Sequence, residues 1–373
     1  MGRSGNSLMQ TQVGLVARVE RERPGAQELA VKVDSNEEMA INYTQLLGRV
    51  EMGEQVLLNT TAVRARLGTG GYHFVMSRSG KQPDLQTEAA GRIVKLRYTP
   101  LQFRCQTVEE QGSPYREAVE SSEGLEGMAV IVAGLHSQIA PAAAAVKGLS
   151  PEAKVAYVMT DTAALPLAFS KLASALKEAG LIDATITVGQ AFGGDYEAVN
   201  LYTGLLAARA VVGAEVVIVA QGPGNVGTET EWGFGSIAQG EHINAVGVLG
   251  GTAVAVPRIS FADPRPRHRG VSRQTLVVLS KVALVRALVS VPAIDSAKLE
   301  LVHRQLDDDG ITEKHEVLVA KGEVGLEVLA ERGVEVRSMG RTPAEDPEFF
   351  LAAGAGGAIA VEANKWTDDS TSD

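Results

Sequence analysis

From residue 128 onward, short apolar runs alternate with longer segments of helical pattern, and this alternation constrains the fold more than any other feature. The runs are MAVIVAG, VAYVMTD, ATITV, EVVIVAQ, TAVAVPRISF, HEVLVA and VEVRSM. Strands of nearly continuous Val, Ile and Ala are typical of parallel sheets that are buried on both faces. Alternating strands and helices indicate right-handed βαβ units. The pattern therefore predicts a Rossmann-like α/β domain over residues 126–362, with a doubly wound, mostly parallel sheet.

One part of this domain has two interpretations. Over residues 276–291, no turn residue separates the helical pattern from the run ALVSVP. The segment is therefore either one long helix or a helix followed by a strand.

The first hundred residues follow a different pattern, which predicts a small all-β domain. They contain five short segments of strand type, VGLVARVE, ELAVKV, EQVLLN, YHFVM and GRIVKLRY, separated by Gly, Pro, Asn and Asp turns. Closing such strands into a barrel removes exposed edges, so we expect a barrel-like module over residues 1–105. The polar residues 106–125 are predicted to be a linker. The acidic residues 363–373 are predicted to be a disordered tail.

Composition narrows the class of partner and the compartment. The formal net charge of -10 repels phosphate backbones and argues against nucleic-acid binding. The single cysteine, Cys105, fits a reducing compartment. The sequence has no apolar stretch of about 18 residues, which argues against a membrane span. We therefore expect a cytoplasmic protein with no membrane and no nucleic-acid partner.

The segment QGPGNVGTETEWGFG carries a candidate cofactor site. Gly222, Gly224 and Gly227 match the spacing G-x-G-x-x-G directly after a predicted strand, where backbone amides of a helix N-terminus hold a pyrophosphate. Glu229 and Glu231 would repel that phosphate. The alternative is a glycine-rich loop that packs against a neighbouring helix or subunit.

The segment ADPRPRHRG carries a candidate substrate site. Arg265, Arg267 and Arg269 alternate along a stretch that two prolines hold extended, and guanidinium groups suit phosphate or carboxylate. In an acidic protein this cluster is the strongest predicted anion site. The alternative is a set of structural ion pairs or a solvated turn.

Candidate catalytic residues follow the predicted strands, because open α/β sheets bind ligands outside the carboxyl ends of their strands. They are His136, Asp161, Asp195, Asp263 and His268. A histidine beside a carboxylate in a crevice could act as a general base or a metal ligand. The alternative role for the short polar residues is helix capping, with Ser137 and Thr162 as further examples. Neither a metal nor a cofactor is specified, since zinc, nucleophile-elbow and Walker motifs are missing from the sequence.

Six strings in order resemble an uncharacterised bacterial family that is defined only as a domain of unknown function. They are NTTA (59–62), LGTGGYHFV (67–75), KLRYTP (95–100), GQAFGGD (189–195), SFAD (260–263) and RHRG (267–270). The resemblance spans roughly residues 11 to 360 of the chain. It implies one co-inherited two-domain unit and a bacterial cytoplasmic source, and it implies no activity, cofactor or site residue.

Three functional hypotheses follow from these patterns. The leading one is an enzyme or binding protein whose ligand is a small anion bearing phosphate or carboxylate. The second is an NAD(P)-dependent oxidoreductase that uses the three glycines. The third is a non-catalytic scaffold or regulatory protein in which the glycine loop and the arginines form a homo-oligomer contact.

Overall fold

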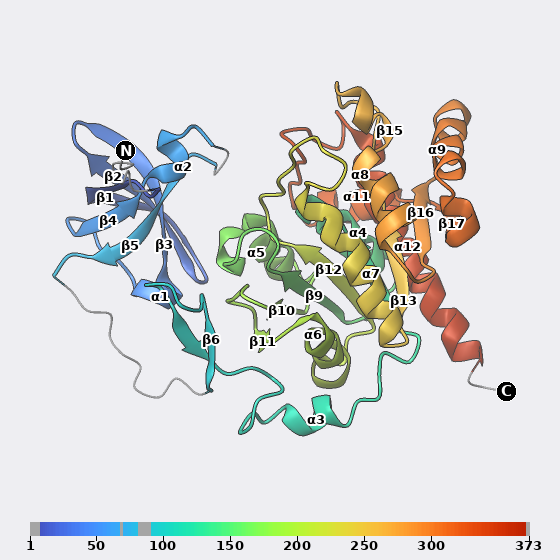
Figure 1. Ribbon diagram of the computed structural model, residues 1–373, viewed down its shortest axis with the longest axis horizontal. Coiled ribbons are helices and arrows are strands. Elements are labelled where there is room, and N and C mark those ends of the chain that lie inside the picture. Colours follow the sequence, from blue (N-terminus) through green and yellow to red (C-terminus); the bar gives the residue numbers. More distant parts are fainter. Residues whose placement is uncertain (1–7, 68–69, 81–90, 371–373) are drawn as a thin grey trace, which may run out of the picture. The chain divides into compact units, whose positions relative to one another are not determined.

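The computed structural model describes residues 8–67, 70–80 and 91–370. The chain divides into two compact units, one of Met1–Ala90 with Val94–Cys105 and one of Gly91–Ile93 with Gln106–Asp373. Figure 1 shows the strands of the first unit in blue and the larger α/β unit in green to red. Each unit is described by itself.

The first unit is a closed five-stranded barrel, as the sequence predicts. Its strands are β1 (Thr11–Arg23), β2 (Ala26–Val33), β3 (Asn36–Tyr43), β4 (Gln55–Asn59) and β5 (Tyr72–Arg78), in the order β1-β2-β3-β5-β4. The sheet closes because β1 pairs with both β2 and β4. Inward-facing side chains such as Val16, Leu29 and Leu58 form its core. The short helices α1 (Thr44–Leu47) and α2 (Thr61–Arg64) lie between strands.

Two strands differ from the sequence prediction for this part of the chain. Strand β3 was missed, because Glu37 and Glu38 interrupt the apolar alternation of NEEMAINY. The run GRIVKLRY lies outside the barrel. Its residues Ile93–Lys95 form β6, which pairs with β7 (Phe103–Cys105) in a separate two-stranded sheet.

The second unit contains an eight-stranded parallel sheet in the order β11-β10-β9-β12-β8-β13-β16-β17. Its strands are β8 (Ala129–Ala133), β9 (Val155–Thr160), β10 (Ala184–Val188), β11 (Tyr196–Ala198), β12 (Val216–Gln221), β13 (Thr252–Val256), β16 (Leu288–Pro292) and β17 (Glu316–Ala320). The minor strands β14 (Ile259–Ser260) and β15 (Gly270–Val271) form a separate antiparallel pair.

Helices cover both faces of this sheet, so it is doubly wound, as predicted. The helices of one core are α6 (Leu201–Ala207), α7 (Ala238–Val248), α8 (Arg273–Val277), α9 (Ser296–Asp308) and α10 (Ile311–Lys314). Those of the other are α4 (Ile139–Leu149), α5 (Lys171–Glu178), α11 (Glu323–Glu331) and α12 (Pro347–Ser370). Successive residues of β8 alternate between the two cores, with Val130 in one and Ile131 in the other. This explains why the strands read as continuous apolar runs.

The strand order differs from that of the dinucleotide-binding fold. That fold keeps its first two strands side by side, in the order 3-2-1-4-5-6. Here β12 lies between β9 and β8, with hydrogen-bonded registers to both. The loops after β8 and β12 lead to helices on opposite faces, so the carboxyl ends of these neighbouring strands form a switch point, where α/β proteins bind ligands.

Other segments of this unit also differ from expectation. The ambiguous stretch 276–291 resolves as α8, a π-helical continuation over Val278–Val282, and then strand β16. The run VEVRSM is not a strand. Residues 106–125, predicted as a linker, contain helix α3 (Arg116–Glu120) and place Val108 and Leu125 in a core of the α/β unit. Helix α12 runs to Ser370, into the predicted disordered tail, and residues 371–373 lie outside the described residues.

Within residues 8–67, 70–80 and 91–370, we find no helix with both the length and the apolar character needed to cross a bilayer.

Candidate functional site

The loops after β8, β12 and β13 lie at one edge of the sheet, because parallel strands end on the same side. The loop after β12 and the loop after β13 are joined there by an ion pair between Glu229 Oε1 and Arg267 Nη2, which are 2.7 Å apart. Two of the segments that the sequence singled out therefore meet at the carboxyl edge.

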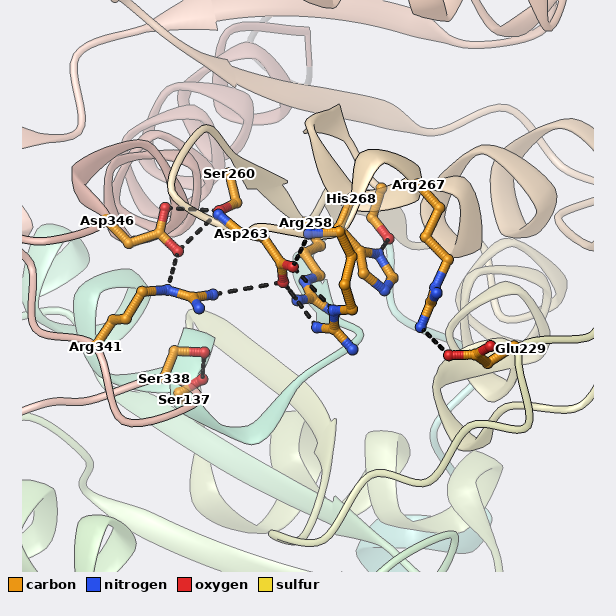
Figure 2. Close-up of polar contacts among 12 residues, drawn as sticks. Ser137, Glu229, Arg258, Ser260, Asp263, Arg267, His268, Ser338, Arg341 and Asp346 are labelled. Carbon is orange, nitrogen blue, oxygen red and sulfur yellow. Dashed lines mark hydrogen bonds and ion pairs between the residues drawn. The ribbon is translucent and has the colours of Figure 1, made fainter.

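At this edge, three arginines surround the carboxylate of Asp263, which is fully buried (Figure 2). Arg258 Nη2 lies 2.7 Å from Asp263 Oδ2. Arg265 donates to both carboxylate oxygens, from Nε at 2.9 Å and from Nη2 at 2.7 Å. Arg341 Nη2 approaches Asp263 Oδ2 at 3.6 Å from a segment much later in the chain. We call these four residues the arginine cluster.

A second buried carboxylate, that of Asp346, fixes Arg341 in place. Arg341 Nε donates to Asp346 Oδ2 at 2.9 Å. Ser260 Oγ lies 2.8 and 2.9 Å from the two oxygens of Asp346, and it accepts a hydrogen bond from the amide of Asp263. The loop after β13 and the segment before α12 are thus linked through buried polar contacts.

The arginine cluster with Asp346 contains three cations and two carboxylates, so it carries one net positive charge. Hydrogen bonding to Arg265 holds the pKa of Asp263 well below its ordinary value. Burial lowers the pKa of Arg258, and the positive charges of Arg265 and Arg341 act in the same direction. Asp263 is therefore ionised at neutral pH, and the guanidinium groups around it outnumber the carboxylates.

The three arginines that the sequence grouped together do not converge. Arg265 lies in the cluster, whereas Arg267 pairs with Glu229. The side chain of Arg269 is exposed, and its carbonyl accepts a hydrogen bond from Gln305. The sequence analysis missed Arg258 and Arg341. Arg258 could have been found, since it follows strand β13 by two residues, but Arg341 carries no local signal.

Two serines lie next to the arginine cluster in Figure 2. Ser137 Oγ donates to Ser338 Oγ at 3.1 Å. Ser338 and Arg341 close one tight turn through two backbone hydrogen bonds of 2.9 Å. The loop after β8 thereby contacts the same turn that supplies Arg341. Ser137, considered in the sequence as a helix cap, makes a contact to another loop instead.

A small cavity lies beside Arg258. This cavity of about 10 Å³ is lined by Leu135, Gln138, Gln239 and Arg258 among others. A volume of this order holds one water molecule at most. A larger ligand would therefore bind on the outer side of the cluster, where the side chain of Arg265 is 37% exposed.

His268 is buried beside the cluster. Its Nδ1 lies 2.7 Å from Ser272 Oγ. Burial, together with the nearby charges of Arg258 and Arg265, lowers its pKa from 6.5 to about 4. At neutral pH it is an uncharged imidazole that is held in place by Ser272.

The glycines 222, 224 and 227 do not form a phosphate-binding helix N-terminus. Gly227 pairs with Phe234 in an antiparallel bridge, which makes the segment a hairpin-like loop. Helix α7 begins only at Ala238, after a 3₁₀ turn. At Gly222 an added Cβ would lie 2.6 Å from the carbonyl oxygen of Ala164. Gly222 is therefore needed for the close packing of two loops. A pyrophosphate site would require a helix that begins at the glycines, and none begins there.

His136 lies after β8 in a second polar group. Its Nε2 is 2.6 Å from Ser170 Oγ. Its Nδ1 is 3.2 Å from both Tyr157 Oη and the carbonyl oxygen of Gln221. Burial lowers the pKa of His136 from 6.5 to about 4. Sequence reasoning named His136 but not Ser170, which lies at the N-terminus of α5.

The two other predicted catalytic carboxylates lie apart from the arginine cluster. Asp161 is exposed and accepts a hydrogen bond of 2.8 Å from the amide of Gln190. Asp195 accepts hydrogen bonds from the amide and the hydroxyl of Thr185, both at 2.8 Å, and it pairs with Lys177. Thr185 lies near the amino end of β10, so Asp195 is at the wrong edge of the sheet to join the site.

The described part of the chain contains no group of three or more His, Cys, Asp or Glu residues that could hold a metal ion. A further histidine, His242, is buried on α7, and its Nδ1 lacks a hydrogen-bond partner within the same described residues.

A comparison with models of protein families places the chain. The model of a family described as protein of unknown function (DUF3866) matches residues 39–357. The chain belongs to this family. The match covers most of the chain, from within β3 to within α12, and includes the residues of the arginine cluster. It confirms the resemblance to a family defined only as a domain of unknown function. No curated protein matches the chain.

Proposed function

We propose that this DUF3866 protein binds a small anionic ligand, bearing phosphate or carboxylate, on the outer side of the arginine cluster. The protein would be a small-molecule binding protein or an enzyme. The observation that carries the proposal is the charge imbalance, with three guanidinium groups held by only two carboxylates at the carboxyl edge of the sheet.

Arg265 and Arg341 have the geometry to contact such a ligand. Arg265 uses Nε and Nη2 for Asp263, and its Nη1 has no hydrogen-bond partner among residues 8–67, 70–80 and 91–370. Arg341 uses Nε and Nη2 for the two carboxylates in the same way. Their carboxylate partners hold both side chains in place, so little side-chain entropy is lost when an anion binds. Guanidinium groups fixed in this way suit the planar oxygens of phosphate or carboxylate.

The hydroxyls of Ser137 and Ser338 supply neutral donors beside these cations (Figure 2). A ligand oxygen that replaced their mutual hydrogen bond would be bound by hydroxyls from two loops. The combination of fixed cations with a few convergent hydroxyls is what anion sites of small-molecule proteins contain. The oxidoreductase hypothesis has less support, because no helix begins at the three glycines and α7 begins only at Ala238.

The test is a thermal-shift screen followed by calorimetry, with inorganic phosphate, sugar phosphates, di- and tricarboxylates and NAD(P). A ligand present at 100 times its Kd stabilises the folded state by about 2.7 kcal/mol. We expect Arg265→Ala to weaken binding of the anion by about tenfold or more, since charge-assisted hydrogen bonds contribute about 1.5–3 kcal/mol.

The matched control is Arg286→Ala, which removes the same charge at the opposite edge of the sheet, where Arg286 pairs with Glu316 at the start of β17. Its affinity should equal that of the wild type. Equal losses in both variants, or a wild type that no anion stabilises, would end the proposal. Stabilisation by NAD(P) alone would favour the oxidoreductase hypothesis.

A further inference from the structure

We propose that Ser170 and His136 form a nucleophile–base pair that cleaves a small carboxylic ester. The proposal does not depend on the anion site. It rests on the second polar group at the carboxyl edge, where Ser170 Oγ and His136 Nε2 are 2.6 Å apart. That distance lies within the range of a nucleophile and its general base.

The hydrogen-bond partners of His136 determine which atom carries the proton. Nδ1 lies 3.2 Å from the carbonyl oxygen of Gln221, which can only accept, so Nδ1 carries the hydrogen. The hydroxyl of Tyr157 lies 3.4 and 3.3 Å from the carbonyl oxygens of Ala220 and Gln221, and it donates to them. A neutral imidazole has one N–H, so Nε2 carries the lone pair and Ser170 donates its proton to it.

Burial keeps this arrangement in the neutral form. Burial lowers the pKa of His136 to about 4, so the imidazole is uncharged at neutral pH and its Nε2 lone pair faces the Ser170 hydroxyl. The carbonyl of Gln221 then has the role that a carboxylate has in Ser-His-Asp triads, because it fixes the ring and its tautomer.

Ser170 is placed for attack by the start of helix α5. It is the N-cap residue, and its Oγ accepts a hydrogen bond of 2.9 Å from the amide of Ala173. One lone pair is used by this amide and the proton points to His136, so the second lone pair is free to attack.

The reaction would follow the acyl-serine route. Ser170 Oγ bonds to the ester carbonyl carbon while its proton moves to His136 Nε2. The carbon–oxygen bond to the alcohol breaks, and the alcohol leaves with that proton. Water then attacks the acyl-serine, gives its proton to Nε2, and releases the carboxylic acid as Ser170 regains its hydrogen. Ser170 is only 3% exposed, so the acyl group must be small and enter past His136, which is partly exposed.

The test is labelling of the full chain with diisopropyl fluorophosphate, read by peptide mass spectrometry. We expect one adduct, on Ser170, with release of fluoride. His136→Gln removes the base and should slow labelling by about 100-fold or more. The wild type should also hydrolyse p-nitrophenyl acetate with a burst of nitrophenol.

Two variants control for folding. Ser170→Asn keeps an N-cap residue of comparable quality but removes the nucleophile, and it should be folded and unlabelled at this helix. Ser174→Ala removes the next serine of α5, whose Oγ contacts Glu178, and it should label at the wild-type rate. An unlabelled Ser170 in the wild type, or equal rates in wild type and His136→Gln, would overturn the proposal. Labelling that fails while the anion still binds would overturn this proposal alone.

Discussion

Arg258 Nη2 lies 2.7 Å from Asp263 Oδ2, and the side chains of Arg258 and Asp263 are 10% and 0% exposed. Each of these charges has been removed from water, and each is tolerated because the other is present. The pair lies at the centre of the arginine cluster, so its integrity determines both the stability of this edge and the placement of Arg265.

The first prediction concerns this pair. Asp263→Ala leaves Arg258 buried without its carboxylate, and breaking a buried pair in this way costs about 3–5 kcal/mol. We expect a loss of that size in the free energy of unfolding, measured by urea denaturation. Glu229→Ala is the control, because Glu229 is 70% exposed in its pair with Arg267 and surface pairs contribute about 0–1 kcal/mol. Similar losses in both variants would contradict the prediction.

The second prediction concerns pH. Burial lowers the pKa values of His136, His242 and His268 from 6.5 to about 4. Between these values the unfolded chain takes up protons that the folded protein does not. Stability therefore falls as the pH decreases from about 6.5 to about 4, by up to about 1.4 kcal/mol per pH unit for each histidine. Urea denaturation across this range measures the slope.

His268→Asn tests one contribution to that slope. Asparagine can still bond Ser272, the partner of His268 Nδ1, but it does not titrate. The slope of the free energy of unfolding against pH should decrease by about the contribution of one histidine, whatever the change in stability at pH 7. Parallel curves for variant and wild type would show that His268 does not remain neutral when folded.

The third prediction is that Asp195 does not contribute to binding at the anion site. Asp195→Asn weakens the contacts to Lys177 and Thr185 at the amino end of β10. We expect a loss of about 1 kcal/mol in the free energy of unfolding, at the low end for a charged hydrogen-bonding group, since 36% of the side chain is exposed. The Kd for the anion should stay at the wild-type value. A tenfold weaker Kd would mean that Asp195 acts at the site after all.

The architecture can be predicted from the sequence because the buried strands of the parallel sheet are continuous apolar runs. Residues such as Val130 and Ile131 face different cores, and both must be apolar, so the run is visible without coordinates. Strand β3 cannot be recognised in this way, because it is not a continuous apolar run. Its Glu38 forms ion pairs with His73 and Arg64. The start of strand β16 could not be predicted for another reason, since no turn residue separates it from the preceding helix.

The site is less predictable, because its partners are far apart in the chain. Asp263 and Arg265 are neighbours and were found, but Arg341 joins them only because the segment before α12 returns to the carboxyl edge. The pairing of His136 with Ser170 likewise depends on the neighbouring positions of the loops after β8 and β9 around β12. Local spacing contains no information about such contacts.

The fourth prediction concerns Gly222, for which the sequence offered a cofactor role. A Cβ there would lie 2.6 Å from the carbonyl oxygen of Ala164, which belongs to backbone and cannot move alone. Gly222→Ala should therefore cost about 1–3 kcal/mol through overpacking of two loops. At Gly227 the nearest atom is the flexible end of Gln274, at 3.2 Å, so Gly227→Ala should cost less than about 1 kcal/mol. Urea denaturation of both variants, together with a nucleotide-binding assay, tests whether the glycines have a packing role or a role in cofactor binding. If the two glycines served a pyrophosphate, both changes would abolish nucleotide binding, whatever each does to stability.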